Sequence, residues 1–457
     1  MSAAPPEQPT SGAVSSEAAP FAASPQAGAT YTLRRALLVD PRTGREAPGS
    51  VCVEQGRIKW LGPPDAQPEG EAIDLVGLVV CPGLIDMHVH LRTPGQEHKE
   101  DLRSGTRAAV AGGFTAVCAM PNTTPALDRP ERVAALLARH AQEAACRVYV
   151  AGAATVDNTG EQLTDFAALR AAGCVAVTDD AYPLQAVAMM RDALEQAAAT
   201  DLLFMAHLEL RELSAGGVIT AGAVAEDLGV SGQDPASESQ ALLRWVEAAD
   251  GRGRLHLLHL NTAAGARLMH YLRPGPFFAH ISAETAPHYL LLTAEAVRRA
   301  GADAKMNPPL RGERDRLALL EAVRQGDIEA LATDHAPHTP AEKAAGLAAA
   351  PFGIVGLETC LGLIITHLVN TGDINLREAL AKLSTNPAHL LGVPGGTLEP
   401  GHPADLTIID LQRAWTVDHT QFQSKGRNTP FAGERLRGKP WGTIVGGDWK
   451  MREGEVL

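Results

Sequence analysis

The sequence has 457 residues, of which 45% are hydrophobic and 20% carry a charge. This composition supplies enough apolar material for a packed core and excludes a disordered or fibrous chain. Lys and Arg number 40 against 53 Asp and Glu, a net charge of −13, and so acidic a surface argues against nucleic acids and anionic membranes as partners, because both bind basic surfaces.

Residues 1–30 are rich in Ala, Pro, Ser, Gly and Thr and contain no Lys or Arg. A secretory signal needs a basic and then an apolar stretch, and a transit peptide needs arginines, so neither is predicted. We expect a disordered extension, because this stretch cannot bury enough apolar area to offset its ordering entropy. No apolar run reaches the length of about 18 residues that crosses a membrane. The six cysteines form no C-x-x-C pair, which predicts reduced core thiols in a cytoplasmic protein.

Residues 31–81 contain short strand-like segments, such as "YTLRRALLVD" and "SVCVEQGRIKWLG", which turn signals separate. Residues 391–457 contain similar segments, such as "ADLTIIDL" and "GTIVGGDWKM". We therefore predict a small composite β-sandwich domain that is built from residues 31–81 plus 391–457.

Residues 82–390 alternate between short apolar runs that end in polar residues and helix-like Ala/Leu/Arg segments. Eight such runs end near positions 88, 122, 155, 180, 207, 259, 288 and 334. Eight strand–helix units are what a (β/α)8 TIM-like barrel of the α/β class requires. An open doubly wound sheet is the alternative, but the chain has neither a G-x-G-x-x-G nor a P-loop fingerprint.

Polar side chains with catalytic potential fall at the carboxyl ends of these runs, where the loops of a parallel barrel meet. They are His88, His90, Asn122, Asp180, His207, His259 and Asp334. An H-x-H pair alone is more often two histidines on a surface strand. Its recurrence with further histidines and a carboxylate at later strand ends instead predicts a transition-metal site.

A two-metal site needs an anionic bridge between the cations. The chain has no lysine between Lys99 and Lys305 that a carbamylated bridge would require. Asp179 and Asp180, in "VTDDA", are the candidates for this bridge. We expect one of the two to cap the following helix instead. We expect a structural role for His256 and leave that of His288 open. The small residues of "HTPAEKAAGLAAAPFG" predict a mobile lid.

Several longer motifs resemble those of the dihydroorotases of the amidohydrolase superfamily, of the bacterial class I type. They include "DMHVHLRTPGQEHKED", "AMPNTTP", "TDDAYPLQ", "KMNPPLRG", "ATDHAPHT", "APFGIVGLET" and "SKGRNTPFAGERLRG". The resemblance runs from about residue 31 to the end of the chain and implies the same barrel, spanning residues 82–390, with the composite β domain.

The resemblance implies a zinc enzyme that hydrolyses a cyclic amide C–N bond, with two Zn²⁺ per subunit expected and one as the alternative. The implied reaction is the reversible cyclisation of N-carbamoyl-L-aspartate to L-dihydroorotate in pyrimidine (UMP) biosynthesis. The metal ligands that it implies are His88, His90, Asp180, His207, His259 and Asp334. The substrate contacts that it implies are His90, Arg92, Asn122, Asn307, His338, Phe352 and Gly353.

In the implied mechanism a metal-bound hydroxide attacks the ring amide, and Asp334 acts first as general base and then as general acid. Arg92 suits the substrate carboxylate, because a guanidinium binds it through two parallel hydrogen bonds. A surface ion pair of Arg92 with Glu97 or Glu100 is the alternative. One segment departs from the family pattern. The family often has a Cys-Glu-Asp-like segment after the histidine of the fifth strand, whereas this chain reads "HLEL" from His207, which predicts altered loop packing.

Two other functions compete with this one. A hydantoinase, dihydropyrimidinase or allantoinase opens similar rings but typically uses the carbamylated lysine, for which there is no candidate here. A non-catalytic scaffold for aspartate transcarbamoylase usually has a broken ligand set, whereas all six positions are kept here. We expect a homodimer, and association with aspartate transcarbamoylase stays open.

Overall fold

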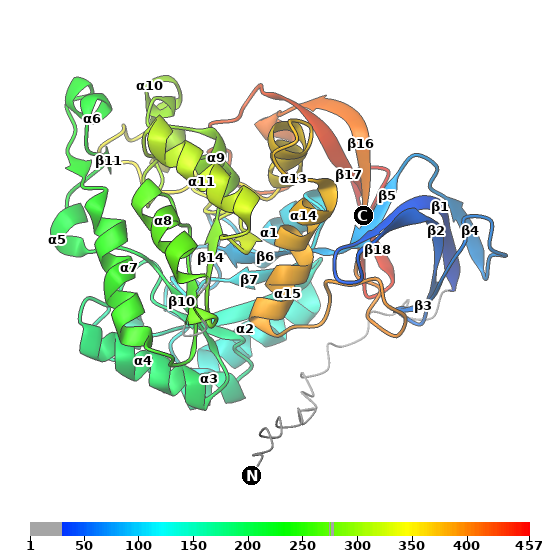
Figure 1. Ribbon diagram of the computed structural model, residues 1–457, viewed down its shortest axis with the longest axis horizontal. Helices are drawn as coiled ribbons and strands as arrows, with labels where there is room; N and C mark the ends of the chain where they lie inside the picture. The colour runs from blue at the N-terminus through cyan, green and yellow to red at the C-terminus, as the bar shows by residue number, and fades with distance from the viewer. Residues whose placement is uncertain (1–29, 274, 276–277) are drawn as a thin grey trace, which may run out of the picture.

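The computed structural model describes residues 30–457 except 274, 276 and 277. The extension predicted for residues 1–30 therefore lies outside the described residues, apart from Thr30. Two bodies make up the described chain, a ring of strands enclosed by helices and a long sheet beside it (Figure 1).

Eight parallel strands form the ring, in the spatial order β15-β14-β13-β10-β9-β8-β7-β6. A parallel bridge between Val89 and His335 joins its first and last strands, and the His90 N–H donates to the His335 carbonyl at 2.8 Å. The predicted (β/α)8 barrel is confirmed. Its strands are β6 (Leu84–Val89), β7 (Phe114–Ala119), β8 (Arg147–Ala153), β9 (Ala176–Thr178), β10 (Leu203–Ala206), β13 (Arg254–Leu257), β14 (Ile281–Thr285) and β15 (Ala330–Leu331).

Helices cover the outside of the ring (Figure 1). All residues of β6 and β7 are buried, as expected for strands packed on both faces. The longer helices are α1 (Leu102–Ala111), α2 (Pro130–Glu143), α4 (Val187–Ala199), α7 (Ala236–Ala249), α8 (Ala263–Leu272) and α11 (Glu313–Gln325). Shorter ones are α3 (Phe166–Ala171), α5 (Arg211–Ser214), α6 (Ala223–Asp227), α9 (Pro287–Leu291), α10 (Ala296–Ala300), α12 (Pro340–Lys343), α13 (Cys360–Ile364), α14 (Leu376–Leu380) and α15 (Asn386–Leu391).

The starts of two helices show how the sequence sets their boundaries. The Asp101 carboxylate accepts the Ser104 N–H at 2.8 Å at the start of α1. The Thr262 hydroxyl accepts the Gly265 N–H at 3.0 Å at the start of α8. Both side chains satisfy a backbone donor that the first helical turn leaves without an internal partner. A small ribbon of β11 (Ile219–Thr220) and β12 (Gly232–Gln233) lies in the connection between α5 and α7.

The second body is one nine-stranded sheet that combines the two ends of the described chain. Its order is β19-β18-β17-β16-β5-β1-β2-β3, with β4 beside β1. Antiparallel pairing of Leu406 with Pro82 and Ile408 with Val80 joins the two ends. The N-terminal strands are β1 (Tyr31–Asp40), β2 (Arg45–Glu54), β3 (Arg57–Gly62), β4 (Glu71–Asp74) and β5 (Val79–Pro82); the C-terminal ones are β16 (Leu406–Thr416), β17 (Arg435–Val445), β18 (Asp448–Arg452) and β19 (Glu455–Val456).

Apolar side chains from both ends share one core in this sheet, among them Leu33, Val51, Val80, Ile408 and Ile444. The sequence prediction of a composite β domain from both chain ends is thus confirmed. We keep residues 82 and 390 as proposed domain boundaries, since β5 ends at Pro82 and β6 begins at Leu84.

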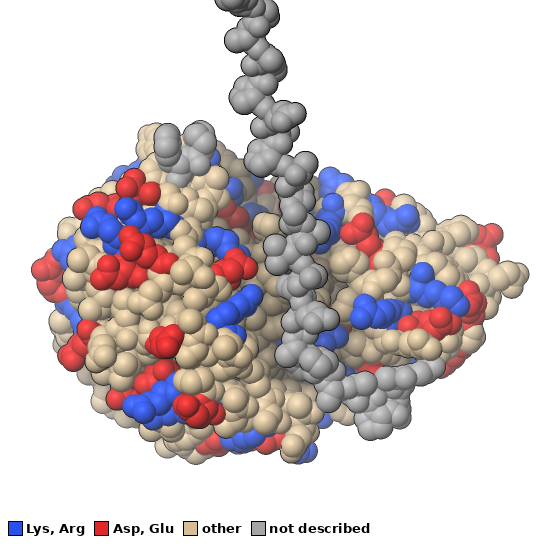
Figure 2. Space-filling model, turned by 90° about the horizontal axis from the view of Figure 1, so that it is seen from below, with Lys and Arg blue, Asp and Glu red and all other residues tan. Residues whose placement is uncertain are grey.

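The cysteines, the helices and the surface charges bear on the predictions made from composition. All six cysteines are buried and none forms a disulfide. Within residues 30–457, apart from the three that are not described, no helix is long and apolar enough to cross a membrane. Figure 2 shows acidic and basic side chains intermixed over the face that it presents.

Candidate metal centre

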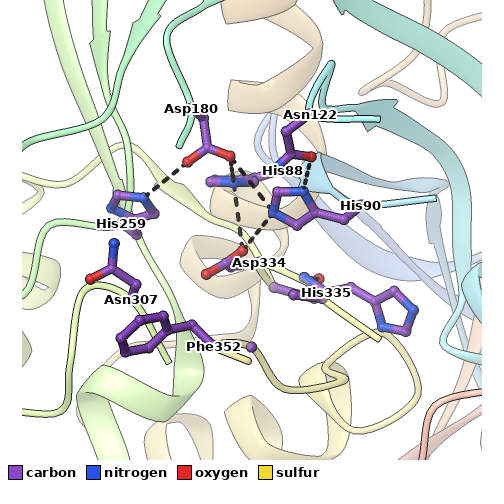
Figure 3. Close-up of polar contacts among 12 residues, drawn as sticks. His88, His90, Asn122, Asp180, His259, Asn307, Asp334, His335 and Phe352 are labelled. Atoms are coloured by element: carbon purple, nitrogen blue, oxygen red, sulfur yellow. Dashed lines mark hydrogen bonds and ion pairs between the residues drawn. The ribbon is translucent and has the colours of Figure 1, made fainter. Parts of the chain in front are cut away.

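Six predicted ligands meet at the carboxyl end of the barrel, and Figure 3 labels five of them, all but His207. His88 lies on β6, and each of the others follows the end of a strand by no more than three residues. All six are buried, with exposed fractions between 0% and 7%. They are His88, His90, Asp180, His207, His259 and Asp334.

The Asp180 carboxylate lies between two pairs of imidazoles. Its Oδ2 is 3.8 Å from the Nε2 atoms of both His88 and His90. Its Oδ1 is 3.0 Å from His207 Nδ1 and 3.7 Å from His259 Nε2. The six-residue set thus contains two groups of three potential ligand atoms, each group within 4.8 Å, and Asp180 belongs to both. Asp180 is thus the one residue common to both groups of potential metal ligands.

Asp334 lies on the side of the first pair. Its Oδ1 is 3.1 Å from His90 Nε2 and 3.6 Å from His88 Nε2. The Asp334 carboxylate and Asp180 Oδ2 therefore lie near the same two imidazoles. From this position Asp334 could bind a cation and also accept a proton from a nearby water.

The donor atoms themselves fit a divalent metal. His88 Nε2 and Asp180 Oδ2 are buried and form no hydrogen bond within the described part of the chain. A buried polar atom without a partner is destabilising, and a cation held between these two atoms would satisfy both. Imidazole nitrogens with carboxylate oxygens are the ligands typical of zinc and related transition metals.

The charges in the cluster favour a cation. Burial by itself would raise the pKa of Asp180, but the neighbouring imidazoles of His207, His259 and His88 outweigh it and hold that pKa well below its usual range. Burial likewise opposes ionisation of Asp334, yet the neighbouring His88 and His90 lower its pKa. Burial lowers the pKa of His259. Both carboxylates therefore stay ionised as anionic ligands.

A chain of hydrogen bonds fixes the ring of His88. Its Nδ1 is 2.7 Å from Oε1 of Glu284, and Glu284 Oε2 is 3.2 Å from His256 Nε2. His256 Nδ1 then meets the Ser282 hydroxyl at 2.8 Å. His256, expected to be structural, thus braces the carboxylate that orients a ligand. The sequence interpretation missed Glu284, although an acidic residue inside the apolar run "ISAET" was the available signal.

Two more of the ligand histidines, His90 and His207, are oriented in the same way. Asn122 Oδ1 lies 2.8 Å from His90 Nδ1, so the ring presents Nε2 to the cluster. Glu209 Oε2 lies 2.9 Å from His207 Nε2 and accepts from the Asn307 amide at 2.9 Å. Glu209 is the acidic residue of the divergent "HLEL" segment, so that segment still contacts the ligand ring.

The expectation that one aspartate of the pair caps the following helix is wrong, because α4 begins after Ala186 without a side-chain cap; Asp179 has a different task. Its Oδ1 accepts the His207 N–H at 2.8 Å and its Oδ2 accepts the Leu184 N–H at 2.9 Å. Asp179 thus ties the ends of two adjacent strands together, and Asp180 is the member of the pair that faces the cluster. His288, on α9, is buried, and burial lowers its pKa to about 4.

Arg92 is a buried guanidinium beside the cluster. Its Nε donates to the Pro337 carbonyl at 3.2 Å, and its Nη2 is 3.2 Å from His338 Nε2. Glu97 and Glu100, its alternative partners, pair instead with Arg139 and His335. In the described part of the chain Arg92 forms no ion pair, which suits a site for an anionic ligand.

The far wall consists of residues that follow β15. His338 Nε2 is 2.8 Å from the Phe352 carbonyl oxygen. Gly353 donates its N–H to the Lys305 carbonyl at 2.9 Å, so this amide already has a partner. Asn428, from the C-terminal segment, donates to the Gly353 carbonyl at 3.0 Å. The sequence interpretation did not single out Asn428 or Lys305.

Three of the predicted site residues adopt a left-handed backbone, which side-chain-bearing residues rarely do. Arg92 has φ of 56°, His259 of 35° and Asp334 of 49°. Each such conformation costs on the order of 1–3 kcal/mol and is kept where the surroundings demand it, typically at functional sites. A cavity of about 440 Å³, lined in part by Asn122, Asn158 and Arg211, reaches the cluster at Asn122, which contacts His90.

Comparison with known proteins gives the family of the chain. The family described as dihydro-orotase-like matches residues 77–262. A dihydroorotase from Pelotomaculum thermopropionicum is 42% identical over 92% of this chain and 98% of its own. One from Geobacillus kaustophilus is 45% identical over 89% of this chain and 95% of its own.

The chain belongs to the dihydroorotase family. Among solved structures, this dihydroorotase-family chain is similar to an L-hydantoinase (dihydropyrimidinase) from Arthrobacter aurescens, with a TM-score of 0.84 and 25% identity over 93% of this chain and 97% of that one. A dihydropyrimidinase from Brevibacillus agri has a TM-score of 0.82 at 20% identity, over 94% and 96% of the two chains. These likenesses place the family's barrel and composite sheet among cyclic-amide hydrolases.

Proposed function

We propose that this chain interconverts N-carbamoyl-L-aspartate and L-dihydroorotate at the cluster around Asp180. The observation that carries the proposal is the juxtaposition of the cluster with Arg92, a buried cation without an ion pair in the described chain. Hydantoin and dihydrouracil lack the ring carboxylate of dihydroorotate, so only the latter gives Arg92 a partner of opposite charge.

We propose Zn²⁺ as the metal, two per subunit, held by His88, His90 and Asp334 on one side and by His207 and His259 on the other, with Asp180 between them. When bound, such a metal lowers the pKa of a coordinated water toward neutrality and polarises the amide carbonyl. The support is the donor set and the shared position of Asp180.

The side chains of the protein supply the remaining steps. Arg92 binds the substrate carboxylate, and Asn122, which lines the adjoining cavity, orients the ring. Asp334 takes the proton of the attacking water and delivers it to the ring nitrogen as the C–N bond breaks. In the direction of ring closure the same carboxylate takes the proton back from that nitrogen.

The test is an elemental analysis of the purified chain followed by assays on L-dihydroorotate, hydantoin and dihydrouracil. Metal-dependent turnover of dihydroorotate alone is the expected result. Preference for the two uncharged rings would instead establish a hydantoinase-type activity. Bound metal without any turnover would contradict catalysis and favour the scaffold.

Substitution of Asp334 tests its role directly. Asp334→Asn keeps an oxygen ligand but removes the proton acceptor, so we expect bound metal and a loss of about 10²–10⁴-fold in kcat. Metal content measured on the same sample separates loss of chemistry from loss of the site. Near-normal turnover in this variant would refute the acid–base assignment.

A further inference from the structure

Two lysines near the far wall of the site are almost completely buried. Lys305 follows α10 by five residues and is 3% exposed, and Lys343, the last residue of α12, is 7% exposed. Burial of an ammonium group is unfavourable unless its three N–H donors find partners. In the described part of the chain neither ammonium group forms an ion pair with a carboxylate. Their partners are backbone carbonyls instead.

Lys305 directs all its donors to one loop. Its Nζ donates to the carbonyls of Leu347 at 2.8 Å, Ala348 at 3.0 Å and Ala350 at 2.6 Å. The same ammonium lies 4.5 Å from the centre of the Phe352 ring, within the range of a cation–π attraction. One side chain therefore fixes both the backbone of the loop and the aromatic ring that follows it.

Lys343 holds the next part of the same loop. Its Nζ donates to the carbonyls of Gly353 at 2.9 Å and Pro351 at 3.0 Å, and lies 3.4 Å from that of Lys305. The Lys305 carbonyl also accepts the Gly353 N–H. The loop and the segment around Lys305 are thus bound to each other at several points.

The first part of the loop, residues 344–350, has few other contacts: Leu347 packs against the large apolar cluster and the Ala350 N–H donates to the Gly346 carbonyl at 2.8 Å. Residues 344–350 read "AAGLAAA", so only one side chain in this stretch exceeds a methyl group. Such a sequence gives few packing contacts and predicts mobility, which is why a lid was expected here. Its backbone carbonyls are the groups that the two ammoniums bind, and they define its position.

This loop leads into the substrate side of the proposed site. Figure 3 shows Phe352 and Asn307 on one side of Asp334 and Asn122 on the other. Gly353 approaches the barrel so closely that a Cβ there would lie 2.6 Å from Ala336 Cβ. Asn307 is two residues from Lys305. The hydrogen bonds of Lys305 and Lys343, which we call the clamp, therefore link two predicted substrate contacts, Asn307 and Phe352.

We propose that Lys305 and Lys343 are positioning residues that hold residues 347–353 as a fixed wall of the substrate pocket. The proposal rests on the proposed function, since the pocket is defined by it. Neither ammonium touches the reacting atoms; each acts through the backbone at Phe352 and Gly353.

The experiment compares three lysine-to-methionine variants of the full chain. Lys305→Met and Lys343→Met remove the clamp. Lys382→Met is the matched control, because Lys382 is equally buried at 6% and donates to the Ile328 carbonyl, which belongs to neither the loop nor the cluster. All three lose hydrogen bonds to backbone, but only two release the loop.

We expect KM for L-dihydroorotate to rise about tenfold or more in the two clamp variants, with kcat changed by less than about threefold and metal content unchanged. Lys382→Met is expected to lower thermal stability without altering KM. An unchanged KM in both clamp variants, or an equal rise in Lys382→Met, would overturn the proposal.

Limited proteolysis with elastase, which prefers small residues, gives a readout that needs no turnover. We expect faster nicking within residues 344–350 in Lys305→Met than in wild type or Lys382→Met. Equal nicking in all of these proteins would contradict the clamp. If Lys305→Met fails to fold, Lys305→Gln, which keeps two N–H donors, takes its place and is expected to nick at an intermediate rate. Failure of the wild type to turn over dihydroorotate would refute the proposed function and leave the nicking comparison intact.

Discussion

At the scale of single residues, the cluster depends on side chains that touch no substrate. Glu284 fixes the ring of His88, and a carboxylate hydrogen-bonded to a ligand imidazole both orients it and makes it a stronger base. Because His88 Nδ1 faces Glu284 at 2.7 Å, the ring presents Nε2 to the cluster. A change at Glu284 should therefore act on metal binding before it acts on catalysis.

We predict that Glu284→Gln weakens metal binding by about 10–100-fold. The amide keeps the size of the side chain but removes the charge that His88 faces. Competition with a chelator measures the affinity directly. Glu329→Gln is the matched control. Glu329 accepts the N–H of Ala283, the neighbour of Glu284 on β14, at 2.9 Å, and it contacts none of the six predicted metal ligands. Equal affinities for Glu284→Gln and the wild type would contradict the role.

The sequence predicted the six-residue cluster because strand ends in a parallel barrel share one face, so polar residues at successive ends must meet. Spacing alone did not separate Asp179 from Asp180, since the two differ only in which way each points at the end of one strand; the choice of Asp180 came from the family resemblance. The sequence interpretation also missed Lys305 and Lys343, whose partners are carbonyls about 10 to 45 residues away. Such contacts depend on the path of a loop, which local sequence patterns do not encode.

At the scale of elements, the eight predicted strand ends agree with the structure. Each of the eight polar positions lies within β6 or no more than three residues beyond the end of a barrel strand. Short buried runs between helical segments made this prediction accurate. The pairing of β5 with β16 follows from no local pattern, because it joins segments more than 300 residues apart. The strand-like segments at both ends predicted a composite domain but not which of its strands pair.

The contact between barrel and composite sheet gives a prediction at this scale. Arg147, the first residue of β8, forms two bonds of 2.7 and 3.1 Å with the buried Asp405. We expect Asp405→Asn to destabilise the protein by about 2–3 kcal/mol, because a buried ion pair loses one charge. Asp74→Asn is the control, since Asp74 and Arg35 form a half-exposed pair at 2.7 Å and the expected cost is below about 1 kcal/mol. Urea unfolding measures both, and equal costs would argue against a role of the Arg147 pair in joining the two bodies.

At the scale of the whole molecule, the two bodies share one core. The largest apolar cluster contains barrel residues such as Val117 and Leu257 together with Val39, Val79 and Ile409 of the composite sheet. We expect a continuous core of this kind to couple the unfolding of the two bodies. The stability of the entire described chain should therefore respond to a single buried group in either body.

His140 is such a group. It lies on the buried face of α2 with Val133 and Leu136 and is 3% exposed. Burial lowers its pKa from 6.5 to about 4. The unfolded chain therefore binds a proton more readily than the folded one between these values. The stability that His140 contributes is complete above pH 6.5 and is lost as the pH falls toward 4.

This difference predicts the pH dependence of stability. Between pH 8 and pH 5 the wild type should lose about 2 kcal/mol of unfolding free energy through His140 alone, and His140→Leu should not. Urea unfolding of metal-free protein at both pH values measures the effect without interference from metal release. His98→Leu, at an exposed position, is the control for the loss of a histidine that is not buried. The contributions of all other groups cancel when the variant and the wild type are compared. If the difference in their unfolding free energies does not change between pH 8 and pH 5, then His140 is protonated as easily in the folded chain as in the unfolded one.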